Sequence, residues 1–113
     1  MRTEFKTPPR VFTADKNGKI KISDCGKIWL GDDEQVTFVT NSGREYDFAA
    51  KNWGFYATPS VNDRLKKEGF KTALVKNKQG RYYVMAVEEA RLNEFNTYIK
   101  QEDCAVEKWL DEQ

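Results

Sequence analysis

Closely spaced turns divide the first half of this chain into short apolar segments. The turn at residues 15–18, Asp-Lys-Asn-Gly, separates segment 11–13 from segment 19–23, in which Ile20 and Ile22 alternate with polar side chains. A period of two is typical of a half-buried strand, and glycine supplies the positive φ that a tight hairpin needs. Further turns at 24–26, 31–34 and 41–43 separate the segments 27–30, 35–40 and 45–49. These connections are too short for parallel crossovers, so this half predicts an antiparallel β-meander of four or five strands.

The second half brings in helices. Thr58 and Pro59, with Ser60 as a competing cap, are suited to begin a short helix that ends before Gly69. Segments 71–76 and 81–87 form a second predicted hairpin around residues 77–80, and a helix is predicted where Leu92, Phe95 and Ile99 recur at helical spacing. The segment 104–110 fits a strand imperfectly and a helical face as well, and a closing strand is slightly favoured.

This order of elements predicts an α+β fold with a mostly antiparallel sheet, in which an N-terminal β-meander is followed by a β-hairpin and two helices. A chain of 113 residues with 39% hydrophobic residues is expected to form one domain, residues 1–113. A domain of this length buries roughly 65% of the surface of its unfolded chain, which is enough for a core without disulfides or metals.

The cysteines and the apolar runs predict a cytoplasmic protein. Cys25 and Cys104 are far apart and have no metal-ligand spacing, so both are expected to be reduced thiols. The sequence has no charged-then-apolar leader and no apolar run approaching about 18 residues, so neither secretion nor a membrane partner is predicted.

The composition removes most catalytic chemistry. The chain contains no histidine, which is the commonest general base and metal ligand, and it has no glycine-rich phosphate loop. The carboxylates at 32–34 lack the spacing of a calcium loop and fit a solvated turn. We therefore predict no catalytic residue, no metal and no cofactor, and favour a protein that is not an enzyme. A small enzyme acting on an anionic or sugar-like substrate is retained as a second alternative, with four unarranged candidate groups: Lys51, Tyr56, Asp63 and Arg64.

Residues 53–64 are the segment that packing explains least. They combine aromatic rings, which stack on sugars, bases or apolar side chains, with hydroxyls, an amide and an arginine at a predicted helix start. Free backbone N–H groups at such a start favour an anion, and an arginine one turn along adds a bidentate donor. The ligand-binding residues predicted on this basis are Trp53, Tyr56, Thr58, Ser60, Asn62 and Arg64.

Ordinary structural roles compete with this interpretation. Trp53 and Phe55 alternate as strand residues do and could fill the core, and Thr58 and Ser60 are common capping residues. The leading hypothesis is nevertheless a small binding or accessory protein with a polar and aromatic anion-binding site at a helix N-terminus. Its partner would be an anionic small molecule or a protein, and the chain would be a monomer or a weak homodimer. Lys19 and Lys21 argue mildly against pairing through the edges of the meander.

The distribution of charge supports one alternative. The net charge is only +1, but residues 64–81 carry seven basic side chains against Glu68 alone, whereas residues 82–113 carry three basic and eight acidic ones. A basic segment beside tyrosines could bind single-stranded nucleic acid, although mutual attraction between the basic and acidic segments explains the same pattern. The residues predicted for this alternative are Lys66, Lys67, Lys71, Lys76, Lys78, Arg81 and Tyr82.

Overall fold

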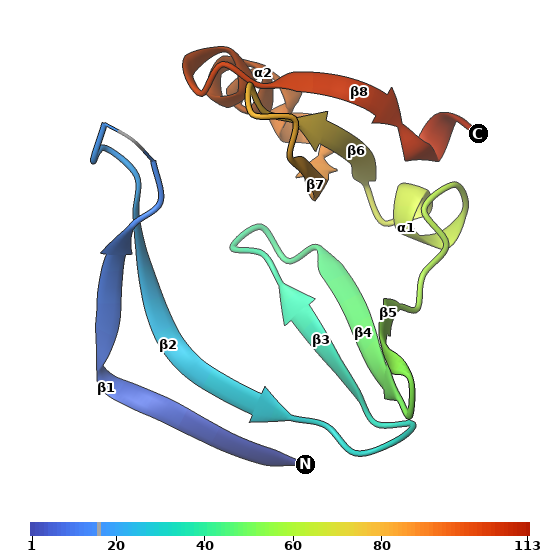
Figure 1. Cartoon of the computed structure of the whole chain (residues 1–113). Coiled ribbons are helices and arrows are strands. Elements are labelled where there is room, and N and C mark those ends of the chain that lie inside the picture. Colours follow the sequence, from blue (N-terminus) through green and yellow to red (C-terminus); the bar gives the residue numbers. More distant parts are fainter. Residues whose placement is uncertain (16) are drawn as a thin grey trace. The chain divides into compact units, whose positions relative to one another are not determined.

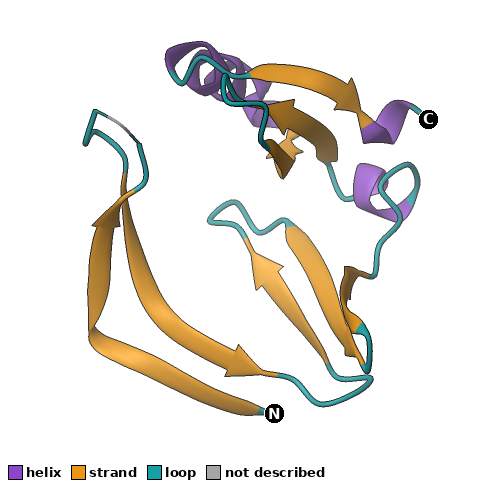
Figure 2. Ribbon diagram, viewed as in Figure 1, coloured by secondary structure: helices purple, strands orange, loops and turns teal. Residues whose placement is uncertain are grey.

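The computed structural model of the chain describes residues 1–15 and 17–113, and it confirms the α+β class (Figure 1). Most of the regular structure is antiparallel strand, with one longer helix (Figure 2). In chain order the elements are β1 (Arg2–Thr13), β2 (Lys21–Trp29), β3 (Gln35–Val39), β4 (Glu45–Lys51), β5 (Gly54–Ala57), α1 (Arg64–Lys67), β6 (Phe70–Lys76), β7 (Tyr82–Glu88), η1 (Glu89–Arg91), α2 (Leu92–Gln101), β8 (Ala105–Trp109) and η2 (Leu110–Glu112). No helix in the described part of the chain has the length and apolar character needed to cross a bilayer.

The described strands form three sheets, with the orders β1-β2, β3-β4-β5 and β7-β6-β8. The chain also divides into two compact units. The first unit comprises Met1–Gln35 and Ala49–Tyr56, and the second comprises Val36–Phe48 and Ala57–Gln113. Neither unit is continuous in sequence, so no single linker separates them, and one domain over residues 1–113 stays a prediction.

In the first unit, β1 and β2 form a two-stranded antiparallel ribbon. Arg2 lies opposite Trp29 and Thr13 lies opposite Lys21, with a shift in register between Phe5 and Arg10. The turn predicted at residues 24–26 is wrong, because β2 runs straight through it. Gly26 has φ +138, and a Cβ there would lie 2.1 Å from the carbonyl oxygen of Glu4. Glycine therefore lets the two backbones approach closely within a continuous strand.

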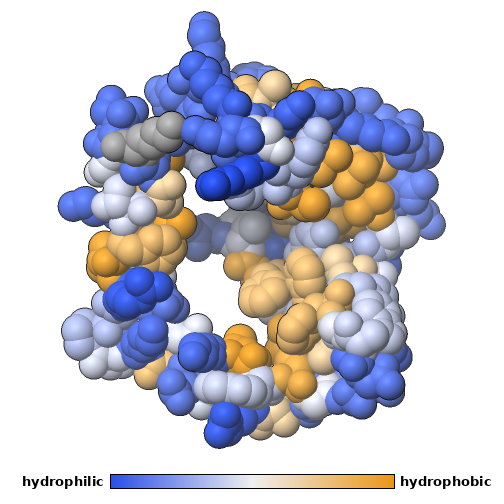
Figure 3. Space-filling view, viewed as in Figure 1, coloured by the Kyte–Doolittle hydropathy of each residue, from blue (hydrophilic) through white to orange (hydrophobic). Residues whose placement is uncertain are grey.

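Much of the ribbon's apolar surface stays in contact with solvent. Phe5 is 67% exposed, and the ribbon's other exposed large apolar residues are Val11, Phe12, Ile22, Ile28 and Trp29. The guanidinium of Arg2 lies 3.9 Å from the ring centroid of Trp29, so part of one ring is covered by a cation. Figure 3 shows apolar residues reaching the visible face of the molecule. The turn predicted at 15–18 includes Lys16, which lies outside the described residues.

The second unit has the packed core. Ala73 and Val75 of β6 are fully buried against Ile99 of α2, and the partly buried residues Met85, Phe95, Cys104, Val106 and Trp109 surround them. Alternation along β6 puts its odd-numbered side chains on the face that α2 covers. The sequence predictions of the hairpin, of this helix and of a closing strand are all confirmed, since β7 pairs with β6 and β8 pairs with the other edge of β6.

A buried carboxylate fixes the C-terminal segment to this sheet. Asp111 is 2% exposed, and it accepts hydrogen bonds from the backbone N–H of Thr72 at 2.9 Å and from Lys71 Nζ at 3.1 Å. Burial raises the pKa of Asp111, but these two donors outweigh burial and hold it below its usual value. Burial likewise lowers the pKa of Lys71, but its hydrogen bond to Asp111 and the nearby Glu112 raise it overall.

Candidate functional site

The turn between β4 and β5 presents an exposed group of aromatic side chains. Asn52 and Trp53 connect the two strands, and Gly54 begins β5 with φ +146. Trp53 is 69% exposed, Phe55 66% and Tyr56 45%. The rings of Trp53 and Tyr56 stack with 6.0 Å between centroids and 29° between planes. We call Trp53, Phe55 and Tyr56 the aromatic turn.

A charged residue of the first unit, Lys51, precedes the aromatic turn in sequence. Lys51, the last residue of β4, forms an ion pair with Asp33. The hydrogen bond and charge of Asp33 raise the pKa of Lys51, so the ammonium stays charged throughout the physiological range. The aromatic turn therefore follows a paired cation and the amide of Asn52, and all of these residues belong to one compact unit.

The polar residues predicted for the site belong to the second unit. Arg64 donates to Asp47 at 3.0 Å and to Thr58 Oγ1 at 3.3 Å, so its guanidinium already has two oxygen partners. Ser60 Oγ accepts from the backbone N–H of Arg64 at 3.2 Å, and Asn62 donates to the terminal carbonyl of Gln113 at 3.5 Å. Each of these side chains has a local structural partner.

Asp47 lies at the centre of this polar group because both of its carboxylate oxygens accept hydrogen bonds. Thr37 donates to its second oxygen at 2.6 Å, and the hydrogen bonds from Thr37 and Arg64 hold the pKa of Asp47 below its usual value despite some burial. The carboxylate is therefore ionised at neutral pH. An anion approaching Arg64 would have to compete with it for the guanidinium.

The predicted helix start is displaced from Thr58, Pro59 and Ser60. The structure has a turn over residues 61–63, and α1 begins at Arg64 and has only four residues. Its first backbone N–H groups are used locally: Arg64 donates to Ser60 Oγ and Leu65 donates to the Ser60 carbonyl at 3.0 Å. A four-residue helix has a small dipole and leaves few free donors, so the geometry gives little support to an anion site at this place.

The predicted ligand-binding residues are thus divided between the two units. Trp53 and Tyr56 lie in the first unit, and Thr58, Ser60, Asn62 and Arg64 lie in the second. Each set is coherent by itself: the first is an exposed aromatic surface and the second is a hydrogen-bonded polar turn. Phe55, which is not among the predicted ligand-binding residues, belongs with the exposed set because β5 leaves its ring in solvent.

Most lysines of the basic segment have acidic partners. Lys67 pairs with Asp63 at 2.7 Å and Lys78 pairs with Asp103 at 3.3 Å. Lys71 contacts both Asp111 and Glu112, and Lys66 donates to the Asp111 carbonyl at 3.3 Å. Lys71 and Lys78 therefore pair with the acidic C-terminal segment, whereas Lys67 pairs with Asp63 just before α1.

Lys76, Arg81 and Tyr82 flank the turn that joins β6 to β7. Lys76 lies opposite Tyr82 in the sheet, and its ammonium lies 5.6 Å from the ring centroid. Both side chains lie on the face opposite α2, where Val84 and Leu74 follow them. This is the part of the basic segment where a cation and an exposed ring are adjacent.

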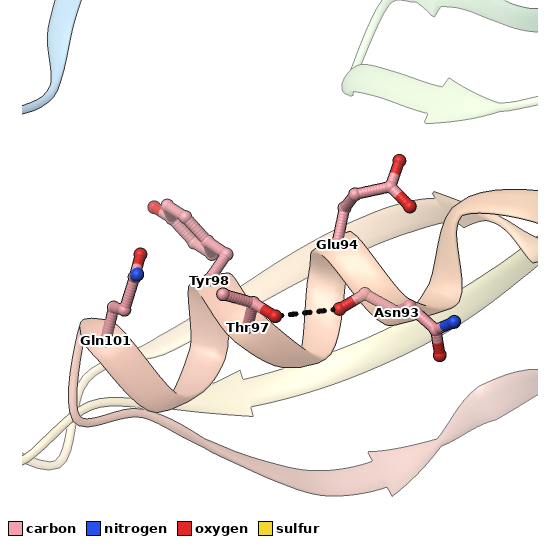
Figure 4. Close-up of a pocket in the computed structure, with 5 residues that line it drawn as sticks. All are labelled: Asn93, Glu94, Thr97, Tyr98 and Gln101. Carbon is pink, nitrogen blue, oxygen red and sulfur yellow. Dashed lines mark hydrogen bonds between the residues drawn. The ribbon is translucent and has the colours of Figure 1, made fainter.

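The hollows of the second unit are shallow. A hollow of about 300 Å³ lies along α2, lined by Asn93, Glu94, Thr97, Tyr98 and Gln101, which recur at helical spacing (Figure 4). Thr97 is turned back to the carbonyl of Asn93, so part of this polar surface serves the helix itself. A second hollow, of about 310 Å³, is lined by Arg44, Gly69, Glu88, Glu89 and Ala90. Neither is an enclosed ligand cavity.

Three of the four candidate catalytic groups form ion pairs. Asp63 is bonded to Lys67, Lys51 to Asp33 and Arg64 to Asp47, and each is an ion pair on the surface. Among the described residues there is no group of three or more Cys, Asp or Glu side chains that could hold a metal ion.

Comparisons with known proteins supply no further guide. No family model, no curated protein and no solved structure matches this chain. The functional argument therefore rests on the chain's own residues.

Proposed function

We propose that this chain is a small non-enzymatic binding protein that contacts a polar partner through the aromatic turn, Trp53, Phe55 and Tyr56. The observation that carries the proposal is the exposure of three large rings at one tight turn. Leaving apolar surface in water forgoes roughly 25 cal/mol per Å² of hydrophobic free energy. A cluster of such residues, in place of scattered single ones, is typical of a contact surface.

The chemistry of the turn favours a partner with a flat, polar ring, of which a sugar is the first candidate. The faces of Trp53 and Tyr56 suit the C–H faces of a sugar, and the stacked arrangement holds both rings in place before binding. The amide of Asn52 and the charges of Lys51 and Asp33 can meet hydroxyl or acidic groups on the rim of that ring. This is a narrower form of the polar or anionic partner predicted from the sequence.

Titration calorimetry tests the proposal, because it also measures binding to the Trp53→Ala variant. The ligands are a neutral oligosaccharide, an acidic oligosaccharide, nucleoside monophosphates and a single-stranded oligonucleotide. A saturable heat of binding is expected with a sugar. Trp53→Ala and Tyr56→Ala should each weaken binding roughly tenfold or more, since aromatic anchors dominate small interfaces.

Phe5→Ala is the matched control. Phe5 is an equally exposed aromatic of the first unit, at 67%, but it lies on β1 outside the turn. Its replacement should leave the affinity unchanged. A ligand that binds the wild type, Trp53→Ala and Tyr56→Ala equally well would show that the aromatic turn is not the contact surface.

The predicted anion contacts of Thr58, Ser60, Asn62 and Arg64 form a separate part of the hypothesis. Asp47→Asn would remove the carboxylate that occupies Arg64, so it should strengthen binding of an acidic ligand at this place. Asp47→Asn and Arg64→Ala should then have opposite effects. Equal affinity in both variants would remove this polar group from the proposal.

Single-stranded nucleic acid is a second candidate, because Lys76 lies over Tyr82 on an open sheet face with Arg81 beside them. In this case affinity should fall steeply as salt rises, in proportion to the number of phosphates neutralised. Lys76→Ala and Tyr82→Ala should both weaken it. Binding that is absent at low salt would exclude this candidate.

We place the protein in the cytoplasm as part of the proposal. Cys25 is exposed and both Cys25 and Cys104 are free, which suits a reducing compartment. An enzyme acting on an anionic or sugar-like substrate stays the second alternative. Turnover that is lost in Tyr56→Phe or Asp63→Asn would favour it over the binding proposal.

A further inference from the structure

The edges of the sheets differ in how well they resist pairing with another strand. β7 has a strand neighbour on one side only, since the described sheet runs β7-β6-β8. It has seven residues in unbroken register with β6, and residues 82–87 carry neither charge nor proline. A regular, uncharged, apolar edge is the kind of strand that pairs with another chain.

The other edges are protected or short. β8 is interrupted by a register shift and carries Glu107 and Lys108. β1 contains Lys6 and the two prolines of residues 8–9, and β2 contains three charged residues. The uncharged strands β3 and β5 have only five and four residues. Among the described edge strands, β7 therefore has the longest uncharged run, residues 82–87.

Exposure agrees with an open edge. Val84 is 65% exposed, Tyr82 53% and Tyr83 45%, although these residues alternate between the two faces of the sheet. Tyr82 and Val84 lie on the open face opposite α2, whereas Tyr83 lies on the face that α2 packs, and its exposure there agrees with the missing neighbour beyond β7. An added strand would cover apolar side chains on both faces at once.

The ends of β7 have complementary charges. Arg81 precedes the strand, and Glu88 and Glu89 follow the uncharged run. In an antiparallel pair of two identical strands centred on Met85, Arg81, which precedes β7, and Glu89, which begins η1, flank the paired strands at opposite ends, so each copy brings its Arg81 to the end of the pair where the other has Glu89. The same register pairs Tyr83 with Val87, an aromatic and β-branched pair of the type that stabilises sheets. A twofold axis makes both contacts occur twice.

We propose that β7 is a homodimerisation edge, and that two copies of this chain join β7 to β7 antiparallel, in a register centred on Met85, into one continuous sheet. The contact pairs backbone N–H and C=O groups that the single copy leaves to solvent. The order of strands across the dimer becomes β8-β6-β7 followed by the same three strands in reverse. The proposal is independent of the ligand of the aromatic turn.

Sedimentation of the full chain over a concentration series tests this proposal. The wild type should show a reversible monomer–dimer equilibrium. Val84→Lys puts a charge in the middle of the paired edge and should raise the dimer dissociation constant about tenfold or more. Val39→Lys is the matched control, because Val39 is 60% exposed on the edge strand β3 of the same unit, and it should leave the equilibrium unchanged.

Charge reversal tests the register and does not depend on the tolerance of Val84. Arg81→Glu should weaken the dimer, and the double variant Arg81→Glu with Glu89→Arg should restore it. Amide exchange of residues 82–86 should slow as the protein concentration rises. A wild type that is monomeric at every soluble concentration overturns the proposal, and so does a dimer that Val84→Lys and Arg81→Glu leave unchanged.

Discussion

The ribbon β1–β2 and the sheet β7-β6-β8 are both antiparallel, but among the described residues the buried core with a packed helix belongs to the sheet. In the sheet, the apolar residues of β6 are buried under α2. In the ribbon, Phe5, Val11 and Ile28 remain exposed because two strands alone have no second layer to cover them. The contrast teaches that alternation in a sequence predicts a strand, whereas burial of its apolar face depends on a partner element elsewhere in the chain.

The largest expected effect compares a buried with an exposed apolar residue. Leu65 is fully buried in the second unit, so Leu65→Ala should lower the free energy of unfolding by about 2–5 kcal/mol. Phe5→Ala, on the exposed ribbon, should change it by no more than about 0.5 kcal/mol. Urea unfolding of both variants measures the difference, and similar losses would break the distinction between the two regions.

The Asp111 carboxylate is the next test of the second unit. Asp111→Ala would leave Lys71 without its buried partner and the Thr72 amide without an acceptor, at a cost of about 3 kcal/mol. Glu112→Ala is the control, since Glu112 is exposed and contacts Lys71 only at 3.6 Å. An equal, small effect of both changes in urea unfolding would remove Asp111 from its role as an anchor.

Two glycines sharpen the comparison within the first unit. Gly26→Ala should destabilise the ribbon by about 1–3 kcal/mol, because its Cβ would meet the backbone of Glu4 and Phe5. Gly54 also has a positive φ, but a Cβ there meets no atom within 4 Å, so Gly54→Ala should cost less. Thermal unfolding ranks the two variants, and a larger loss for Gly54→Ala would contradict the close approach at Gly26.

The pH dependence of stability should come partly from Asp111. Its pKa is lower in the folded than in the unfolded chain, so its stabilisation is full above the unfolded value of 3.8 and is lost as the pH falls through the folded pKa. Urea unfolding of the wild type and Asp111→Asn, from neutral pH to about pH 3, should show a gap that narrows in acid. A gap independent of pH would mean that the charge of Asp111 contributes nothing.

The smallest expected effect on stability belongs to the aromatic turn. Trp53→Ala removes a ring that is 69% exposed, so the free energy of unfolding should change by about 0.5 kcal/mol or less. Thermal unfolding measures this change. A loss of several kcal/mol would show that Trp53 packs as part of the fold, as one interpretation of its alternation with Phe55 allows.

The second half of the chain was predictable because its signals are local. Leu92, Phe95 and Ile99 repeat at helical spacing; Ile99 is buried in the core, Phe95 packs against it and Leu92 is partly buried. The turn after β6 uses Asn77, whose side chain accepts from the backbone N–H groups of Gln79 and Arg81. Gly69 has φ +101 and follows Glu68, the C-cap residue of α1, as predicted for the end of that helix.

The predictions that failed depended on contacts distant in sequence. Gly26 indicates a turn from its neighbours alone, but in the structure it admits the backbone of β1, about twenty residues earlier. Thr58 and Pro59 carry a helix-start signal, but α1 begins later, at Arg64. The hydroxyl of Thr58 instead accepts a hydrogen bond from Arg64, and its backbone N–H donates to the Asp47 carbonyl. Asp111 has no local signal at all, because its partners lie on β6.

The candidate site was predictable in its residues and not in its arrangement. Aromatic density singled out Trp53 and Tyr56, and the structure places them in a stacked, exposed pair. The partner of Arg64 could not be read from the sequence, since Glu68 lies at helical spacing and Asp47 does not. Glu68 instead accepts from the backbone N–H of Glu45. Helical spacing holds for the pair Asp63–Lys67, but it does not identify the partner of Arg64, which comes from β4.

Amide chemical-shift mapping of the full chain is the most direct test of the proposed contact surface. The protein is titrated with the neutral and acidic oligosaccharides, the nucleoside monophosphates and the oligonucleotide, in the wild type and in Trp53→Ala. The account predicts saturable shifts centred on residues 51–57 with a sugar, and their loss in Trp53→Ala. Shifts centred on another part of the chain, or shifts at the turn that persist in Trp53→Ala, would contradict it.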